Sequence, residues 1–320
     1  HDLSFAGKLN LLYIVLHAGA VVFFFICSYM LTTRLLSSLF ASFILAFGAV
    51  FWFQSLIAEV FPLNTILISI VIFLLLVWKC NRKKYQKDNK LLLLSAFIYG
   101  LAVSNQQASL LLIPLILFVI FKGDRKIFLD VRLLLGGAIL FCLGFILPYM
   151  YVPIAAGRDP YLNWENATNL NGLYRVITRR VYAEVSQTGA AYVTFNQLSI
   201  DKASAQIIPF IKYLMNNFGL FYFSLGILGL FYLIKRKETF IWQFILLGIF
   251  CTGLFFAVYA PINWQATEWD DFNIVIMSHQ RFYTVSLFFY SFLIAFGINM
   301  LLDQLKKFKK TVLAGTLAIL

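Results

Sequence analysis

Nine apolar segments follow one another along the chain and restrict its fold more than any other feature. In order they cover residues 9–33, 35–56, 62–78, 91–103, 108–121, 133–154, 218–234, 240–260 and 282–302. A helix needs about 20 apolar residues to cross a bilayer. Hydrophobic residues make up 61% of the chain and charged residues only 12%, so lipid must surround most of the surface. We predict an all-α polytopic membrane protein with about eight to nine transmembrane or partly spanning helices.

The basic residues predict how these helices are oriented. Most of the 26 Lys and Arg residues lie at Arg34 and in the connections 79–90, 122–132, 235–237 and 306–310. Loops with such an excess of Lys and Arg normally face the cytoplasm. The net charge of +12 is therefore an orientation signal and not a nucleic-acid-binding surface. The extracytoplasmic side then receives residues 59–64, 104–107, 155–206 and 261–280.

The domain organisation is simple. We expect residues 1–320 to form a single membrane domain, with residues 155–206 as an extracytoplasmic loop. The chain starts at His1, and its last apolar run starts at Thr311 and is too short for a span. We therefore expect a fragment that is truncated at both ends.

The stretch from Trp52 to Asn64 carries the first candidate site residues. Trp52 and Glu59 are seven residues apart, which predicts that they share one face of a helix. Glu59 ends its apolar segment, and Pro62 favours the start of the next helix. A carboxylate at a membrane boundary is a candidate functional group, with a capping or snorkelling acid as the structural alternative. The candidates for substrate binding are Trp52, Gln54 and Asn64.

Three consecutive amides separate the two shortest apolar segments. Asn105, Gln106 and Gln107 lie between residues 91–103 and 108–121. Polar groups at this depth are tolerated only when they are buried in protein or line a wet cavity. We expect two short helices that meet below the outer surface. The amides are candidates for binding sugar hydroxyls or a phosphate, and interhelical hydrogen bonds that hold a tight hairpin are the equal alternative.

The long outer loop and its border supply the remaining candidates. Leu173, Val176 and Ile177 follow helical spacing, which predicts an interfacial helix in the headgroup layer. Arg residues on another face of this helix would bind a phosphate through two parallel hydrogen bonds, or simply attract anionic lipid. The substrate-binding candidates here are Tyr149, Arg158, Asn163, Trp164, Arg175, Arg179 and Tyr182.

Metal and cofactor sites have weaker support. The acidic run at residues 268–271, with His279 after it, would hold a divalent metal that bridges phosphate oxygens, but such runs are more often solvated loops. We assign no metal site and no resident cofactor. The four cysteines lack ligand-like spacing and are interpreted as small buried apolar residues: Cys27, Cys80, Cys142 and Cys251.

Several of these stretches together resemble one family. Residues 8–12 resemble the Arg-Leu-Asn-Leu-Leu stretch that opens a helix in this family, with Lys8 in place of the Arg. Residues 52–64 resemble its Trp-x-Gln-x-x-x-Ala-Glu-Val-Tyr-x-Leu-Asn signature, with Phe61 in place of the Tyr. Residues 100–107 resemble its Gly-Leu-Ala…Asn-His-His turn, although Gln106 and Gln107 replace the histidines. Residues 147–164 resemble its Leu-Pro-Tyr-x-Tyr-x-Pro…Asn-Trp run, and residues 179–182 its Arg-x-x-Tyr.

The family is that of the transmembrane O-mannosyltransferase-like proteins, long catalogued as a domain of unknown function, in the GT-C superfamily of membrane glycosyltransferases. The resemblance implies a GT-C-like bundle and a polyprenyl-phosphate-linked sugar as donor. It also implies transfer to an acceptor protein (at Ser or Thr) or glycan on the extracytoplasmic face, in a bacterial inner membrane or the endoplasmic reticulum. The family's acidic motif precedes the Arg-Leu-Asn helix and would supply the principal base. Glu59 is therefore expected to have a supporting catalytic role.

The leading hypothesis is thus a membrane glycosyltransferase whose partners are the bilayer, a lipid-linked sugar and an acceptor, with no nucleic acid. A transporter or flippase of lipid-linked saccharides is the alternative. It would place polar residues near the midplane and on both sides of the membrane, whereas here they gather on one side. A structural membrane subunit would leave the outer Trp, Arg and acidic clusters unexplained.

Overall fold

The computed structural model describes residues 4–82, 89–161, 163–178, 204, 206–259 and 281–319. All regular elements in these residues are helical, which confirms the prediction of an all-α polytopic membrane protein. Six helices are long and apolar enough to cross a membrane, or seven if one bent pair counts as a span. The six spans lie in α1 (Phe5–Thr32), α4 (Val60–Arg82), α7 (Val131–Ala156), α11 (Ile207–Lys235), the stretch Thr239–Val258, and α15 (Thr284–Ile319).

The shorter elements connect these spans. The two short apolar segments form α5 (Lys90–Asn105) and the pair of η1 (Gln107–Leu112) and α6 (Ile113–Gly123), which are shorter than a full crossing, as expected. The bent pair is α2 (Leu35–Ala46) and α3 (Ala49–Ser55). The remaining elements are η2 (Arg125–Leu129), η3 (Trp164–Asn166), α8 (Leu170–Thr178), α12 (Thr239–Ile249), the π-helical turn η5 (Phe250–Leu254), α13 (Phe255–Tyr259) and η6 (Arg281–Tyr283).

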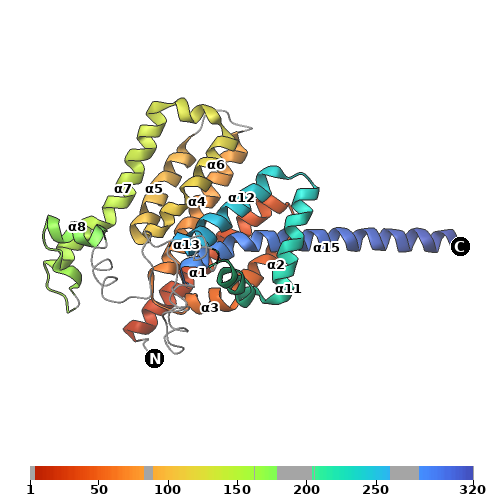
Figure 1. Ribbon diagram of the computed structural model, residues 1–320, viewed down its shortest axis with the longest axis horizontal. Helices are drawn as coiled ribbons and strands as arrows, with labels where there is room; N and C mark the ends of the chain where they lie inside the picture. The colour runs from red at the N-terminus through yellow and green to blue at the C-terminus, as the bar shows by residue number, and fades with distance from the viewer. Residues whose placement is uncertain are drawn as a thin grey trace.

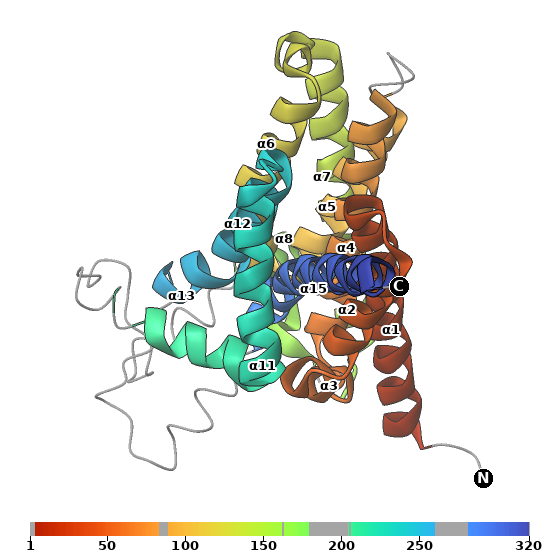
Figure 2. The same ribbon diagram turned by 90° about the vertical axis from the view of Figure 1, so that its right-hand side faces the viewer.

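Helix α15 is the centre of the bundle. It packs against α1, α2 and α4 and against α11 and α12, and Figure 2 looks almost along it, with α1 and α2 on one side and α11 and α12 on the other. In the 18-residue apolar stretch of α15, 78% of the residues are buried, whereas in that of α7 only 6% are. Helix α7 packs mainly on α5 at the edge of the α4, α5 and α6 group (Figure 1).

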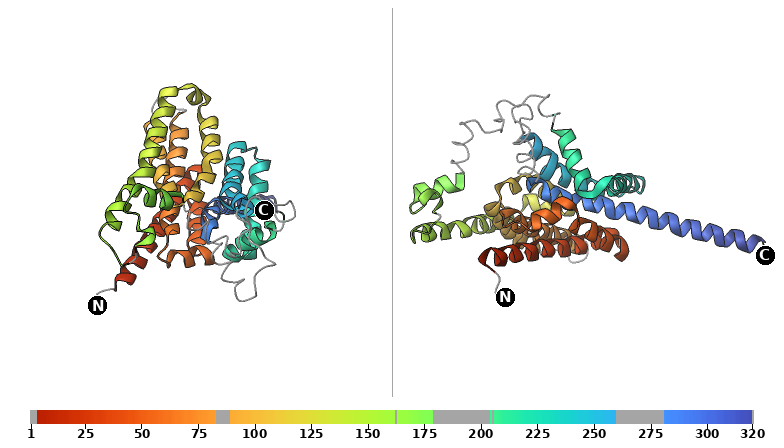
Figure 3. Two further views of the ribbon diagram at one scale, coloured as in Figure 1. Left: turned by 60° about the vertical axis from the view of Figure 1, so that its left-hand side comes forward. Right: turned by 90° about the horizontal axis from the view of Figure 1, so that it is seen from below.

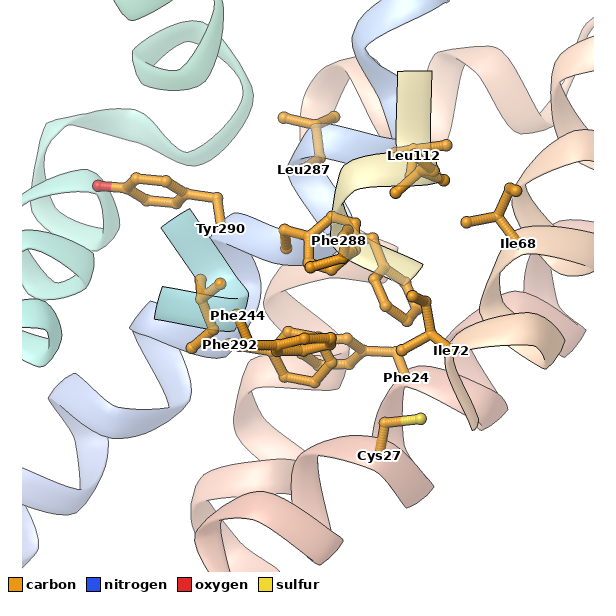
Figure 4. Packing of buried hydrophobic residues seen from close by; sticks show 14 of the residues in the cluster. Phe24, Cys27, Ile68, Ile72, Leu112, Phe244, Leu287, Phe288, Tyr290 and Phe292 are labelled. Carbon is orange, nitrogen blue, oxygen red and sulfur yellow. The ribbon is translucent and has the colours of Figure 1, made fainter. Parts of the chain in front are cut away.

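Aromatic side chains form the core around α15. Phe24 of α1 is fully buried between Phe288 and Phe292 of α15, and its ring centroid lies 4.7 Å from that of Phe292 (Figure 4). Phe244 of α12 adds a further buried ring beside Phe292. These pairs are tilted or edge-on, the geometries that aromatic quadrupoles favour. Aromatic rings of α1, α12 and α15 therefore join the helices on the two sides of α15.

Glycines allow two pairs of helices to approach closely. A Cβ at Gly100 of α5 would overlap the backbone carbonyl of Phe141, and one at Gly144 of α7 would overlap that of Phe97. Gly229 of α11 and Gly297 of α15 meet the partner backbone in the same reciprocal way. Lipid tails give little hydrophobic drive for helix association, so close backbone packing at small residues is a main source of stability.

The segment predicted as one span at residues 35–56 is bent by 64° between α2 and α3. The break falls at Gly48, where a Cβ would lie 2.5 Å from the side-chain amide nitrogen of Asn217. The Asn217 Oδ1 atom accepts hydrogen bonds from the backbone N–H groups of Val50 and Phe51, each at 3.0 Å. Asn217 thus caps α3 from α11, which itself bends at Gly219 (φ 71°).

Two polar clusters lie at the end of the bundle where the predicted cytoplasmic connections meet. The Asp303 carboxylate accepts hydrogen bonds from Arg34, Arg236 and the Tyr232 hydroxyl. Arg82 pairs with Asp124, and this hydrogen bond lowers the pKa of the Asp124 carboxyl below its usual value.

Candidate functional site

An ion pair joins the α3–α4 connection to the start of the last helix. One guanidinium nitrogen of Arg281 donates to both carboxylate oxygens of Glu59, at 2.7 and 2.8 Å. Each side chain is 33% exposed, so the pair is half-buried. The Arg281 guanidinium also lies over the rings of Phe61 and Phe282, 5.5 and 5.7 Å from their centroids, a favourable cation–π arrangement.

The prediction that Trp52 and Glu59 share a helical face is wrong. Helix α3 ends at Ser55 and α4 begins at Val60, so Glu59 lies in the connection between them. Pro62 is in the first turn of α4, where its missing N–H leaves no hydrogen bond unmade, as the sequence predicted. The seven-residue spacing fails because α3 ends four residues before Glu59.

A small cavity of about 20 Å³ lies next to the ion pair, between α4, η1, η5 and α15. This volume suits one or two water-sized groups. In its polar wall, the Ser109 hydroxyl donates to the Asn64 side-chain oxygen at 2.8 Å, and Gln106, 3% exposed, lies alongside. The Arg281 Nε–H is buried and has no partner among the described residues. The cavity is therefore lined by neutral polar side chains and by a cation that is paired with Glu59 and has one N–H without a partner among the described residues.

Two of the three consecutive amides hold neighbouring segments together. Asn105 donates to the Val60 carbonyl at the start of α4 (2.8 Å), and Gln107 donates to the Ile177 carbonyl of α8 (2.6 Å). Both bonds lead to other helices, α4 and α8, and not across the expected hairpin. Gln106, between them, is the one that faces the cavity.

The helix predicted in the outer loop is present as α8, and its Arg175 pairs with Glu165 at 2.9 Å. Tyr149 donates to the Ser104 carbonyl, and Asn163 to the Ala156 carbonyl. Arg158 is exposed just after α7, and Trp164 begins η3. Arg179 and Tyr182 lie outside the described residues. Of the two arginines expected on one face of this helix, the structure therefore describes only Arg175.

The two candidates on α3 do not line the cavity beside the ion pair. Trp52 is half-exposed and stacks on Phe47 with ring centroids 5.5 Å apart, while Gln54 is buried. The adjacent Phe51 stacks on His17 of α1, whose two ring nitrogens have no partner among the described residues. Helix α3 is thus held by α1 and by the Asn217 cap.

Metal ligands do not gather in the described part of the chain, where no group of three or more His, Cys, Asp or Glu residues occurs. The acidic run at residues 268–271 and His279 lie outside the described residues. All four cysteines are free thiols. The prediction that all are buried is wrong for Cys80 and Cys142, which are exposed; Cys142 lies on α7, which leaves most of its surface uncovered.

Sequence reasoning missed the partner of Glu59 and the cap of α3. Arg281 follows the acidic run at residues 268–271 in the sequence, and nothing local links it to Glu59. Asn217 borders the apolar segment 218–234, and nothing in its local sequence points to α3.

Comparisons with known proteins confirm the family resemblance. Residues 2–127 match the family model described as the protein O-mannosyl-transferase TMEM260 N-terminal domain. A mouse protein O-mannosyl-transferase TMEM260 is 26% identical over 276 residues, which cover 81% of this chain and 36% of the relative. The Dictyostelium discoideum protein O-mannosyl-transferase tmem260 is 22% identical over 260 residues, 76% of this chain and 30% of the relative. The chain spans about a third of the length of these curated relatives. No solved structure matches significantly.

Proposed function

We propose, from the resemblance of this chain to protein O-mannosyl-transferases of the TMEM260 type, that it forms the membrane domain of a glycosyltransferase. The donor is a sugar, mannose by the names of the relatives, carried on a polyprenyl phosphate. The acceptor is a protein hydroxyl on the extracytoplasmic face. A GT-C-like bundle suits this reaction, because the chain has many spans and a polar region at one end.

The observation that carries the proposal is the Glu59–Arg281 pair beside the cavity. Sugar transfer breaks the bond between the anomeric carbon and a phosphate oxygen, so negative charge develops on the departing phosphate. A fixed cation near that oxygen stabilises the transition state without reorganisation. Glu59 holds one nitrogen of Arg281, and the Nε–H of the same guanidinium has no partner among the described residues.

In this proposal Glu59 is the positioning acid for Arg281. The remaining requirement is a base that removes the proton from the acceptor hydroxyl. Asn64 and Gln106 at the cavity are suited to hydrogen-bond sugar or phosphate oxygens.

The test is transfer of mannose from a polyprenyl-phosphate donor to an acceptor protein by the natural protein that carries this chain. We expect Arg281→Gln to lower kcat by about 10²–10³-fold, as does loss of one preorganised donor to a developing anion. Arg281→Lys should recover only part of the rate because it loses the planar guanidinium. Lys212→Gln, an exposed residue early in α11, is the matched control. Equal rates for Arg281→Gln and the control would refute the proposed role.

A transporter or flippase of lipid-linked saccharides remains the second candidate. In the described spans, the Asp, Glu, Lys and Arg residues lie near the helix ends and not at mid-membrane. Transporters normally bind substrate near the midplane, so this distribution favours the enzyme. Movement of a fluorescent lipid-linked sugar across vesicles that contain the protein, without any transfer to acceptor, would favour the transporter.

A further inference from the structure

A groove of about 620 Å³ lies between the end of α11 and the part of α15 that continues past it. Figures 1 and 3 show α15 extending beyond the rest of the bundle after this point. The groove is at the opposite end of the molecule from the Glu59–Arg281 pair, and its volume is in the range of ligand sites. Nothing in the proposed transfer reaction uses it.

The rim of the groove is strongly basic. Lys235 and Arg236 come from the end of α11, and Lys306 and Lys307 come from α15. The one acid in the lining is Asp303, which already accepts hydrogen bonds from Arg34, Arg236 and Tyr232.

Two of these cations lack an acidic partner in the part of the chain that the structure describes. Lys235 and Lys306 are exposed and make no ion pair with an acid among the described residues. Two flexible ammonium groups on neighbouring helices suit a phosphate oxygen as point charges. The shared ligand chemistry is therefore a phosphate anion.

The walls of the groove suit a ligand that also has an apolar part. Phe231 lines the groove and is 62% exposed, and Met300 lies opposite on α15. An exposed aromatic ring beside a basic rim matches the boundary between headgroup and acyl chain in a bilayer. A free phosphate or a soluble metabolite would leave this apolar wall uncovered.

We propose that the groove between α11 and α15 binds one anionic phospholipid. Its phosphate lies between Lys235 and Lys306, and the first part of an acyl chain lies against Phe231 and Met300. The Asp303 network supports the site, because it holds the end of α11 against α15 and fixes Arg236, whose guanidinium lies 4.8 Å from the centroid of the Tyr232 ring. The predicted cytoplasmic leaflet, where anionic lipids are concentrated, is the source of the ligand.

The experiment measures lipid adducts by native mass spectrometry on the natural protein that carries this chain. Phosphatidylglycerol and phosphatidylcholine are titrated in parallel, at two salt concentrations. We expect tighter binding of phosphatidylglycerol, with an affinity that falls as salt rises. The Lys235→Gln/Lys306→Gln variant should bind phosphatidylglycerol roughly 30-fold more weakly, and its phosphatidylcholine affinity should not change.

The matched control is Lys122→Gln/Lys126→Gln, which removes the same charge from another connection at the same end of the bundle. It should leave phosphatidylglycerol binding within about twofold, because general surface attraction is spread over many charges. Equal losses in the two variants would mean general attraction only and would overturn the proposal. Equal binding of the two lipids by the unaltered protein would overturn it as well, without relying on any variant. Displacement of the lipid by millimolar glycerol phosphate would show a soluble anion site instead. Transfer activity is not a readout here, so failure of this proposal is distinct from failure of the proposed enzyme.

Discussion

One nitrogen of the Arg281 guanidinium donates hydrogen bonds to both carboxylate oxygens of Glu59, which lies 222 residues earlier in the chain. The pair connects residues 2–127, which match the TMEM260 N-terminal domain, to the start of α15. It also orients the guanidinium that lines the cavity. Both functions predict that the two residues act as a unit.

We expect Glu59→Gln to lower the rate of sugar transfer by no more than the roughly 10²–10³-fold expected for Arg281→Gln, because Glu59 acts through Arg281, with little change in thermal stability. A half-exposed ion pair contributes at most about 1 kcal/mol to folding. Transfer rates and thermal unfolding of the purified natural protein are the measurements. The double variant with Arg281→Gln should be no slower than the slower single variant, as residues that act as a unit behave. Near-normal transfer by Glu59→Gln would contradict the prediction.

Replacing Gly144 by Ala should destabilise the α5–α7 pair by about 1–3 kcal/mol, because the new Cβ would overlap the carbonyl of Phe97. Gly137→Ala, in the same helix, is the control: a Cβ there has nothing within 4 Å. The control should be neutral or gain up to about 1 kcal/mol from helix propensity. Unfolding in a denaturing detergent gives both values, and equal effects would show that the close contact is not needed.

Loss of the Asn217 cap should also destabilise the fold. In Asn217→Ala, the buried N–H groups of Val50 and Phe51 lose their acceptor, at a cost of about 1–3 kcal/mol. The neighbouring Asn216 is exposed, so Asn216→Ala should change stability by less than about 0.5 kcal/mol. If both variants unfold at the same temperature, α3 does not depend on the cap.

The predicted orientation is tested by labelling single cysteines with an impermeant thiol reagent in intact cells. Lys126→Cys in η2 should be protected, and Thr168→Cys before α8 should react. Both positions are exposed, so protection would reflect the membrane and not burial. Cys80 and Cys142 must first be replaced by Ser because they are exposed. The reverse pattern would place the Glu59–Arg281 pair on the cytoplasmic side.

The long spans were predictable because the need for apolar side chains in lipid is a property of each segment by itself. For the same reason the short helices around Asn105 to Gln107 were anticipated. The break at Gly48 was not, because the apolar run continues through it and the bend depends on Asn217, far away in the sequence. An isolated glycine inside an apolar segment was the available signal.

The candidate site was predictable only in part. Glu59, Asn64 and Gln106 could be identified because a polar group in a membrane segment stands out locally. Their common surroundings could not, since Arg281, Thr252 and Thr284 reach the cavity from the other end of the chain. Contacts over such separations are set by how whole helices pack, and single-sequence patterns carry no information about that.

The central place of α15 has a consequence for the order of synthesis. A ribosome adds roughly 5–20 residues per second, so α15 follows α1 into the membrane after roughly 15 s to a minute. Until then Phe24 lacks its aromatic partners, and the Ser37 hydroxyl lacks Asn299, to which it donates in the finished bundle. Until α15 is made, the surfaces of α1 and α2 that will contact it are uncovered. A membrane insertase or chaperone that shields these surfaces would therefore raise the yield of folded protein.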